Sequence, residues 1–307
     1  GTQNTAVGSG ALDSNTTAAN NSAFGYNALG ANTTGANNVG IGQFSLDANT
    51  TGGSNTALGH NALTGNTTAS HNTAVGKGAL EVNTTGESNV AVGSQCLDAN
   101  TTGLNNNAVG RQALDNNTTG SQNIAVGTNA LDANTTADAN TAIGTSALRA
   151  NTTGTLNVAL GKDSLKANTT GATNTAVGVE ALQSNTTAAN NVAVGYYSGQ
   201  ANTTGTQNVS LGAYSFYTNT QSNRNTALGY NTLSSHNLTS DSNGYNTCVG
   251  FQAGSDITTG NQNTFIGALV GDTTTTAANN TVVGYNAFTA NTTGATNTAV
   301  GGSAMAA

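Results

Sequence analysis

Charged side chains are scarce in this chain of 307 residues. Asp, Glu, Lys and Arg make up 6% of it, against about 25% in an ordinary globular domain. Six Lys and Arg against thirteen Asp and Glu leave a formal net charge of −7, which excludes a basic nucleic-acid binder. Pro is absent and charged residues are few, so the composition is not that of a disordered chain rich in Pro, Glu and Lys. No apolar run approaches the ~20 residues that span a membrane, so we expect no membrane insertion.

A seventeen-residue repeat fills the chain. Eighteen copies of Asn-x-x-apolar-Gly begin at Asn4 and end at Asn297. Sixteen of the seventeen spacings between successive copies equal one repeat, and the spacing from Asn225 to Asn246 is four residues longer. The consensus is N-T-A-V-G-x-x-A-L-D-A-N-T-T-G-x-x, in which we number the first Asn position 1. We expect one repeat domain over 1–307, with irregular turns at about 208–279 and a four-residue insertion within 225–245.

The period and the composition predict an all-β fold, a parallel β-solenoid (β-roll) of eighteen turns. Seventeen residues are too few for a pair of helices, which needs about 33. Asn, Thr and Gly are also poor helix formers. In a solenoid each repeat forms one turn that stacks on the last at the inter-strand spacing of about 4.8 Å.

Two columns of apolar residues are candidates for the interior. Position 4 is Val, Leu, Ile or Phe in every turn, and position 9 is Leu in twelve of eighteen turns. We interpret both as inward-facing. Position 5 is Gly in all eighteen turns, which predicts a positive φ or a close backbone approach there.

Position 3 carries small residues where a solvated face would be polar. If position 4 points inward, position 3 points outward, because side chains alternate along a strand. Position 3 is nevertheless Ala in thirteen turns, which favours contact with a second chain, and a lone solenoid with so thin a core would gain burial from association. This hypothesis assigns the self-association face to Ala74, Ala91, Ala108, Ala125, Ala142, Ala159, Ala176 and Ala193.

Asn recurs at positions 1 and 12, and we expect these side chains to form ladders that hold the corners of the turns. Asn-Thr-Thr occupies positions 12–14 in thirteen turns. Each copy is formally an N-glycosylation acceptor, and the alternative is a Thr-rich strand chosen for β-propensity.

The runs of Asn-Thr-Ala-Val-Gly at 4–8, 72–76, 174–178 and 297–301 resemble the head repeats of trimeric autotransporter adhesins, and similar repeats occur in phage tail fibres. The resemblance implies a left-handed parallel β-roll in which three chains pack side by side. The usual turn of that family is about three residues shorter, and we expect no neck, coiled-coil stalk or membrane anchor within residues 1–307. A homotrimer and surface anchoring are therefore expectations from the resemblance.

Residues that could carry chemistry are few and separated. His60 and His71 share a turn, and Cys96 and Cys248 lie nine turns apart, which is too far for a disulfide. Glu81, Asp98, Asp115 and Asp132 form a row at position 10, followed by Arg149 and Lys166, which we interpret as a solvated face. We expect no catalytic residues, no metal and no cofactor.

Aromatic residues gather at positions 6 and 7 of turns 12 to 15, beside the insertion. They are Tyr196, Tyr197, Tyr214, Tyr230 and Phe251. They are candidates for a glycan- or receptor-binding platform, and the alternative is a stacked ladder that stabilises an irregular region. The Thr rows at positions 13 and 14 suggest ice binding as a further alternative. Adjacent Thr residues point to opposite faces, however, and leave one row on each face.

Together these patterns predict a non-enzymatic structural fibre or adhesin shaft on a cell or virion surface. We expect its partners to be copies of itself, as a homo-oligomer such as a trimer or as an end-to-end filament, and a host or surface glycan. The alternative is a ligand-binding solenoid, which would bind glycan through the aromatic patch or ice through the Thr rows. Because the register at the first residue nearly continues that at the last, we expect an internal stretch of a longer fibre or rods that stack end to end.

Overall fold

The protein is described from a computed structural model, which covers residues 1–238 and 240–306. It is an all-β solenoid in which every turn contributes one strand of three residues. The solenoid divides into two compact units, Gly1–Thr155 and Leu156–Ala307. The strands of the first unit are β1 (Thr5–Val7), β2 (Ser22–Phe24), β3 (Val39–Ile41), β4 (Thr56–Leu58), β5 (Thr73–Val75), β6 (Val90–Val92), β7 (Asn107–Val109), β8 (Ile124–Val126) and β9 (Thr141–Ile143). Those of the second are β10 (Val158–Leu160), β11 (Thr175–Val177), β12 (Val192–Val194), β13 (Val209–Leu211), β14 (Thr226–Leu228), β15 (Thr247–Val249), β16 (Thr264–Ile266), β17 (Thr281–Val283) and β18 (Thr298–Val300).

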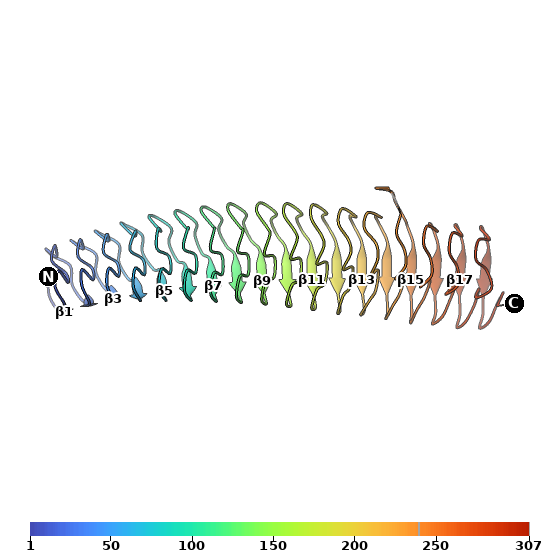
Figure 1. Ribbon diagram of the computed structural model, residues 1–307, viewed down its shortest axis with the longest axis horizontal. Coiled ribbons are helices and arrows are strands. Elements are labelled where there is room, and N and C mark those ends of the chain that lie inside the picture. The colour runs from blue at the N-terminus through green and yellow to red at the C-terminus, as the bar shows by residue number, and fades with distance from the viewer. Residues whose placement is uncertain (239, 307) are drawn as a thin grey trace. The chain divides into compact units, whose positions relative to one another are not determined.

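Within each unit every strand pairs in parallel with the strand of the next turn (Figure 1). The register advances by one repeat, so that Ala108 of β7 lies opposite Ala125 of β8. Between β14 and β15, where Thr226 pairs with Thr247, the advance is four residues longer than one repeat. The inserted segment before β15 extends further than the matching segments of its neighbours (Figure 1). The predicted parallel solenoid is therefore confirmed.

Positive φ angles set the corners of each turn. In the turn that begins at Asn106, Gly110 has a φ of 135°, and Gln112 and Leu114 have φ values of 55° and 54°. A Cβ atom on Gly110 would lie 2.6 Å from the carbonyl oxygen of Gly127 in the next turn. The predicted reason for Gly at position 5 is confirmed, since both the positive φ and the close approach exclude a side chain.

The interior is lined by alanine at position 3, and this overturns the expected inward face of the strand. Ala108 is 0% exposed, whereas its neighbour Val109 at position 4 is 41% exposed. The assignment of position 4 to the interior and of position 3 to the outer surface is therefore wrong. All eight alanines proposed as a self-association face are buried inside the solenoid: Ala74, Ala91, Ala108, Ala125, Ala142, Ala159, Ala176 and Ala193.

The physical reason is the narrow interior of so short a turn. Position 9, occupied by residues such as Leu114, is buried as predicted and fills most of the space. The strand can then add only a methyl group from its inner face. In turn 16 Phe265 replaces the alanine, and Gly271 replaces the leucine at position 9. A Cβ atom on Gly271 would overlap the ring of Phe265, so the two positions share one volume.

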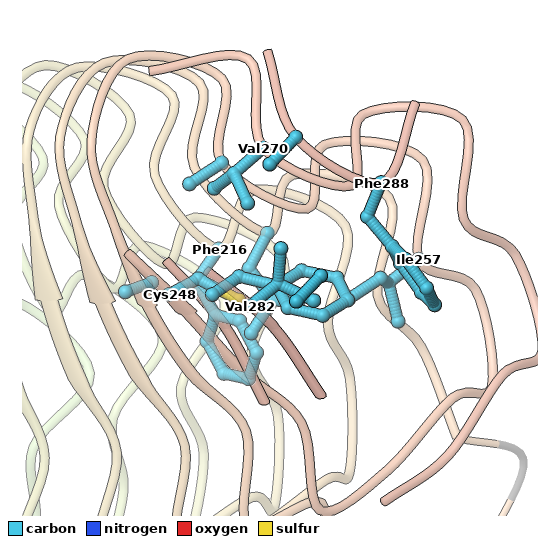
Figure 2. Close-up of a cluster of buried hydrophobic side chains, with 12 residues drawn as sticks. Phe216, Cys248, Ile257, Val270, Val282 and Phe288 are labelled. Atoms are coloured by element: carbon cyan, nitrogen blue, oxygen red, sulfur yellow. The ribbon is translucent and has the colours of Figure 1, made fainter. Parts of the chain in front are cut away.

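A distinct cluster of larger side chains fills the interior of the second unit from turn 13 onward (Figure 2). Phe216, Phe265 and Phe288 are at most 1% exposed, and the rings of Phe265 and Phe288 meet edge to face at 6.1 Å. Figure 2 shows Cys248, Ile257, Val270 and Val282 gathered with Phe216 and Phe288. The irregular turns are thus filled by larger side chains than the regular turns, and these side chains are as fully buried as the alanine and leucine that they replace.

Two Asn ladders replace apolar packing at one end of the turns, and the position 12 ladder is interrupted in turns 14 to 16 by His236, Ile257 and Thr274. Asn117 at position 12 donates through Nδ2 to Asn100 Oδ1 of the preceding turn at 2.8 Å and to the Gly120 carbonyl oxygen at 2.9 Å. Asn106 at position 1 also donates to the Gly120 carbonyl, at 2.8 Å, and its backbone N–H donates to Asn89 Oδ1 at 2.9 Å. Each of these bonds contributes about 1 kcal/mol. The predicted ladders are confirmed at both positions.

Candidate functional site

The outer face of the sheet carries a column of aliphatic side chains, with Phe24 as one aromatic member, at position 4 in each unit. Parallel register places each of these side chains beside its counterpart in the next turn. The exposed members are Val7, Phe24, Ile41, Leu58, Val92, Val109, Val126 and Ile143 in the first unit and Leu160, Val194, Leu228, Ile266 and Val300 in the second. Five others are half-buried: Val75, Val177, Leu211, Val249 and Val283. We call this surface the aliphatic column.

No charged residue interrupts that face. None of the eighteen strands contains Asp, Glu, Lys or Arg. Position 2, which also points outward, is mostly Thr, Val or Ile, and Ile124, Val158 and Val192 are exposed there. An antiparallel or solvated sheet normally places polar and charged residues on its outer face. A contiguous exposed apolar surface is a candidate interaction site.

The predicted aromatic residues form one continuous ladder on the corner that follows β12 to β15. The ring centroids of Tyr196 and Tyr197 lie 4.0 Å apart, and Tyr214 lies 5.6 Å from both. Tyr230 lies 6.1 Å from Tyr214 and 5.6 Å from Phe251. We call these residues, with Tyr217, the aromatic ladder.

Tyr217 was not predicted from the sequence, because it lies at position 10 and not in the columns of positions 6 and 7. Its ring contacts Tyr214 at 5.6 Å and Tyr197 at 6.1 Å. A second, shorter ladder in the first unit was also missed. There Phe44 lies 5.4 Å from Tyr26 and 6.5 Å from His60. These three residues differ in type and alternate between positions 6 and 7, so no single column of the repeat reveals the shorter ladder. Their common location at the corner formed by positions 6 and 7 is the one sequence signal for it.

The inserted segment before β15 is tied to the turn before it. The Gly244 backbone N–H donates to the Asn223 carbonyl at 2.9 Å, and Asn223 Nδ2 donates to Asp241 Oδ1 at 2.6 Å. Arg224 lies over the Tyr245 ring at 5.8 Å and donates to its hydroxyl at 3.0 Å. These contacts lie before the strand in each turn, whereas the aromatic ladder follows it.

Comparison with protein-family models, with curated proteins and with solved structures finds no match.

The carboxylates at position 10 are close enough to perturb one another. Burial, reinforced by Glu81 and Asp115, raises the pKa of Asp98 to about 6. Arg149 Nε lies 3.6 Å from Asp132 Oδ2 at the end of the row. No group of three or more His, Cys, Asp or Glu among residues 1–238 and 240–306 could hold a metal ion. The same residues contain no helix that could cross a membrane.

The cysteines and one histidine are enclosed. Cys96 and Cys248 are buried and free, and burial raises the pKa of each thiol to about 12, which leaves little nucleophilic thiolate. His236 is fully buried against Phe216, and its Nε2 lies 3.0 Å from Ser222 Oγ. Burial lowers the pKa of His236 to about 4. No solvent-accessible nucleophile and base are brought together by these residues.

The Thr rows and the Asn-Thr-Thr motifs serve the backbone. Thr118 at position 13 donates its hydroxyl to the Thr135 carbonyl oxygen of the next turn at 3.0 Å, and this bond recurs along both units. Thr119 at position 14 is exposed. The acceptor amide of the motif, represented by Asn117, is 0% exposed and already donates two hydrogen bonds. A glycan on that nitrogen would replace one of its two N–H groups and so remove at least one of these buried bonds.

Proposed function

We propose that the protein is a structural repeat fibre or adhesin shaft of a cell or virion surface, which associates with copies of itself through the aliphatic column. The observation that carries the proposal is the row of uncharged, exposed aliphatic side chains along the outer face of β1 to β9 and of β10 to β18.

Burial of that row would supply stability that a single chain lacks. The interior adds about one leucine and two alanines per turn, represented by Leu114, Ala108 and Ala113. Each CH₂ group removed from water contributes about 0.8 kcal/mol. The column repeats in every turn, so a copy that contacts it in register gains the same contact in every turn. A homotrimer, as the resemblance to adhesin head repeats implies, is the assembly that we favour.

Ice binding is the less favoured use of the Thr rows. The position 13 hydroxyls are engaged by backbone carbonyls of the next turn, which leaves position 14, where Thr119 is exposed, as the Thr row that could meet ice. A single row offers a crystal surface less than a plane of two rows would.

Mass in solution tests the proposal. We expect the wild-type chain to sediment as a trimer or a larger closed oligomer. The variant Val92→Glu/Val109→Glu/Val126→Glu places three charges on the column and should sediment as a monomer with an unchanged β-sheet circular dichroism spectrum. The matched control Thr85→Glu/Thr102→Glu/Thr119→Glu places the same charges in the same part of the first unit, on exposed position 14. The control should remain associated.

A wild-type chain that is monomeric at all concentrations would overturn the proposal. Equal dissociation by both triple variants would show that charge alone, and not the aliphatic column, controls association.

A further inference from the structure

We propose that the aromatic ladder is a binding site for an uncharged polysaccharide, which would lie across turns 12 to 15. The site shares no residue with the aliphatic column and does not rest on self-association. It consists of Tyr196, Tyr197, Tyr214, Tyr217, Tyr230 and Phe251, which are six of the fourteen Phe and Tyr residues of the chain.

The fold does not require aromatic side chains at these positions. Position 6 of other turns is occupied by Arg111 or Lys77, and position 7 by Gln112, whose φ of 55° nearly equals that of Tyr197. Tyr197 and Tyr214 adopt a φ of 56°, and a bulky residue in the left-handed region is strained by about 1–2 kcal/mol. At these two positions the aromatic residues therefore occupy a conformation that bulky side chains disfavour.

The rings are also accessible and prearranged. Tyr196 is 44% exposed, and Tyr230 and Phe251 are each 49% exposed. The half-buried rings of Tyr197 and Tyr214 support them from inside the ladder. Because neighbouring rings already hold one another, a ligand would order few side chains on binding, which favours affinity.

The chemistry of the ladder selects a sugar chain. Phenol rings combine an apolar face with a hydroxyl group that donates and accepts hydrogen bonds, and a pyranose presents the same combination of C–H faces and hydroxyls. A repeating polymer also suits a row of rings that recurs in successive turns. We expect an uncharged ligand, because the ladder contains no charged residue that could pair with an ionic polymer. Glu180, which interacts with Tyr196 from the preceding turn, and the net charge of −7 further disfavour an anionic polymer.

The experiment is calorimetric titration of the whole chain with neutral oligosaccharides of one to eight sugars, taken from β-glucan, α-glucan, mannan and chitin series. We expect one series to bind with an affinity that rises with chain length and then becomes constant once the four turns are covered. The variant Tyr230→Gln/Phe251→Gln should weaken that binding by about tenfold or more. Its unchanged circular dichroism spectrum would establish that the fold is intact.

Tyr285→Gln is the matched control. Tyr285 occupies position 6 of turn 17 and is exposed, and it has no ring contact with the ladder. Its substitution should change the affinity by less than about twofold. The proposal is overturned if no neutral series binds, if only anionic polysaccharides bind, or if the double variant binds as tightly as the wild type. If the wild type binds no sugar and the folded double variant loses self-association, the ladder is instead a contact between copies, and the proposal is again overturned. The charged variants of the aliphatic column lie in the other unit, so the two proposals fail independently.

Discussion

Replacing one buried leucine of the repeat tests which side chains form the interior. Leu114 occupies position 9 of its turn and is 0% exposed, between Leu97 and Leu131 at the same position of the adjacent turns. Leu114→Ala removes three carbon atoms. At about 0.8 kcal/mol per buried carbon the transfer contribution is about 2.4 kcal/mol, and incomplete collapse of the cavity brings the loss to about 3 kcal/mol.

Hydrogen exchange measured by mass spectrometry is the assay, because each turn of a solenoid contacts only its neighbours and the loss should stay local. Amides of the altered turn and of the two turns beside it should exchange about a hundredfold faster than in the wild type. Amides of β2 and β3 should keep their rates.

Leu104→Ala is the control, because it makes the same change at a residue of the first unit that is 41% exposed. It should lower the local opening free energy by less than about 1 kcal/mol. Equal acceleration by the two variants would refute the assignment of position 9 to the interior. Uniform acceleration across the whole unit would refute the expectation that each turn depends only on its neighbours.

Three other perturbations follow from contacts along the solenoid. Gly110→Ala should lower the urea midpoint by the equivalent of about 2 kcal/mol or more, because its Cβ would meet the next turn's carbonyl oxygen at 2.6 Å. Gly78→Ala should have a smaller effect, because its Cβ would meet only the flexible Glu81 carboxylate within 3 Å. Similar midpoints for the two variants would refute the stated role of position 5. The pKa of His236 lies at about 4 in the folded chain, below its ordinary 6.5. The folded state therefore resists a proton that the unfolded state accepts, and stability should fall by about 3 kcal/mol as the pH drops from about 6.5 to about 4. Urea unfolding of His236→Gln should lack that component, and an unchanged pH dependence would count against it. Asn117→Asp removes both Nδ2 hydrogen bonds and buries a carboxylate, so thermal unfolding should show a loss of about 3 kcal/mol. Asn116→Asp removes only one exposed hydrogen bond, to the Asp132 carbonyl, and should cost less than about 1 kcal/mol.

The periodic part of the fold was predictable because the repeat fixes which residues stack. The solenoid, the corner at Gly110 and the ladder at Asn117 each follow from a residue type that recurs at one position. Which face of the strand points inward was not predictable from alternation, because alternation separates two faces without saying which one is inside. Side-chain size suggested that Val109 is inside, but the narrow turn admits only Ala108.

One pair of residues held the missing information. Phe265 at position 3 coincides with Gly271 at position 9 of the same turn, and such an exchange of volume indicates that both positions share the interior. The candidate surfaces were predictable in part for the same reason. The aromatic ladder follows columns 6 and 7, but Tyr217 joins it from position 10 through the lateral contacts of its ring, which the column pattern does not reveal.

The large side chains around Phe265 bear on how the chain finds its alignment during folding. A chain of near-identical repeats can pair a strand with the turn after next, and a slip of a whole repeat leaves every side chain on its proper face. Most of the first unit offers alanine and leucine to any such partner. Around turn 16 the Phe265 ring lies beside Gly254 at position 9 of the preceding turn, where a Cβ atom would be only 3.3 Å from the ring. A slip of one repeat would replace Gly254 by the buried Leu233 of turn 14, which is larger. The irregular cluster therefore penalises misaligned pairing, so that one departure from the repeat specifies the alignment of the regular turns nearest to it.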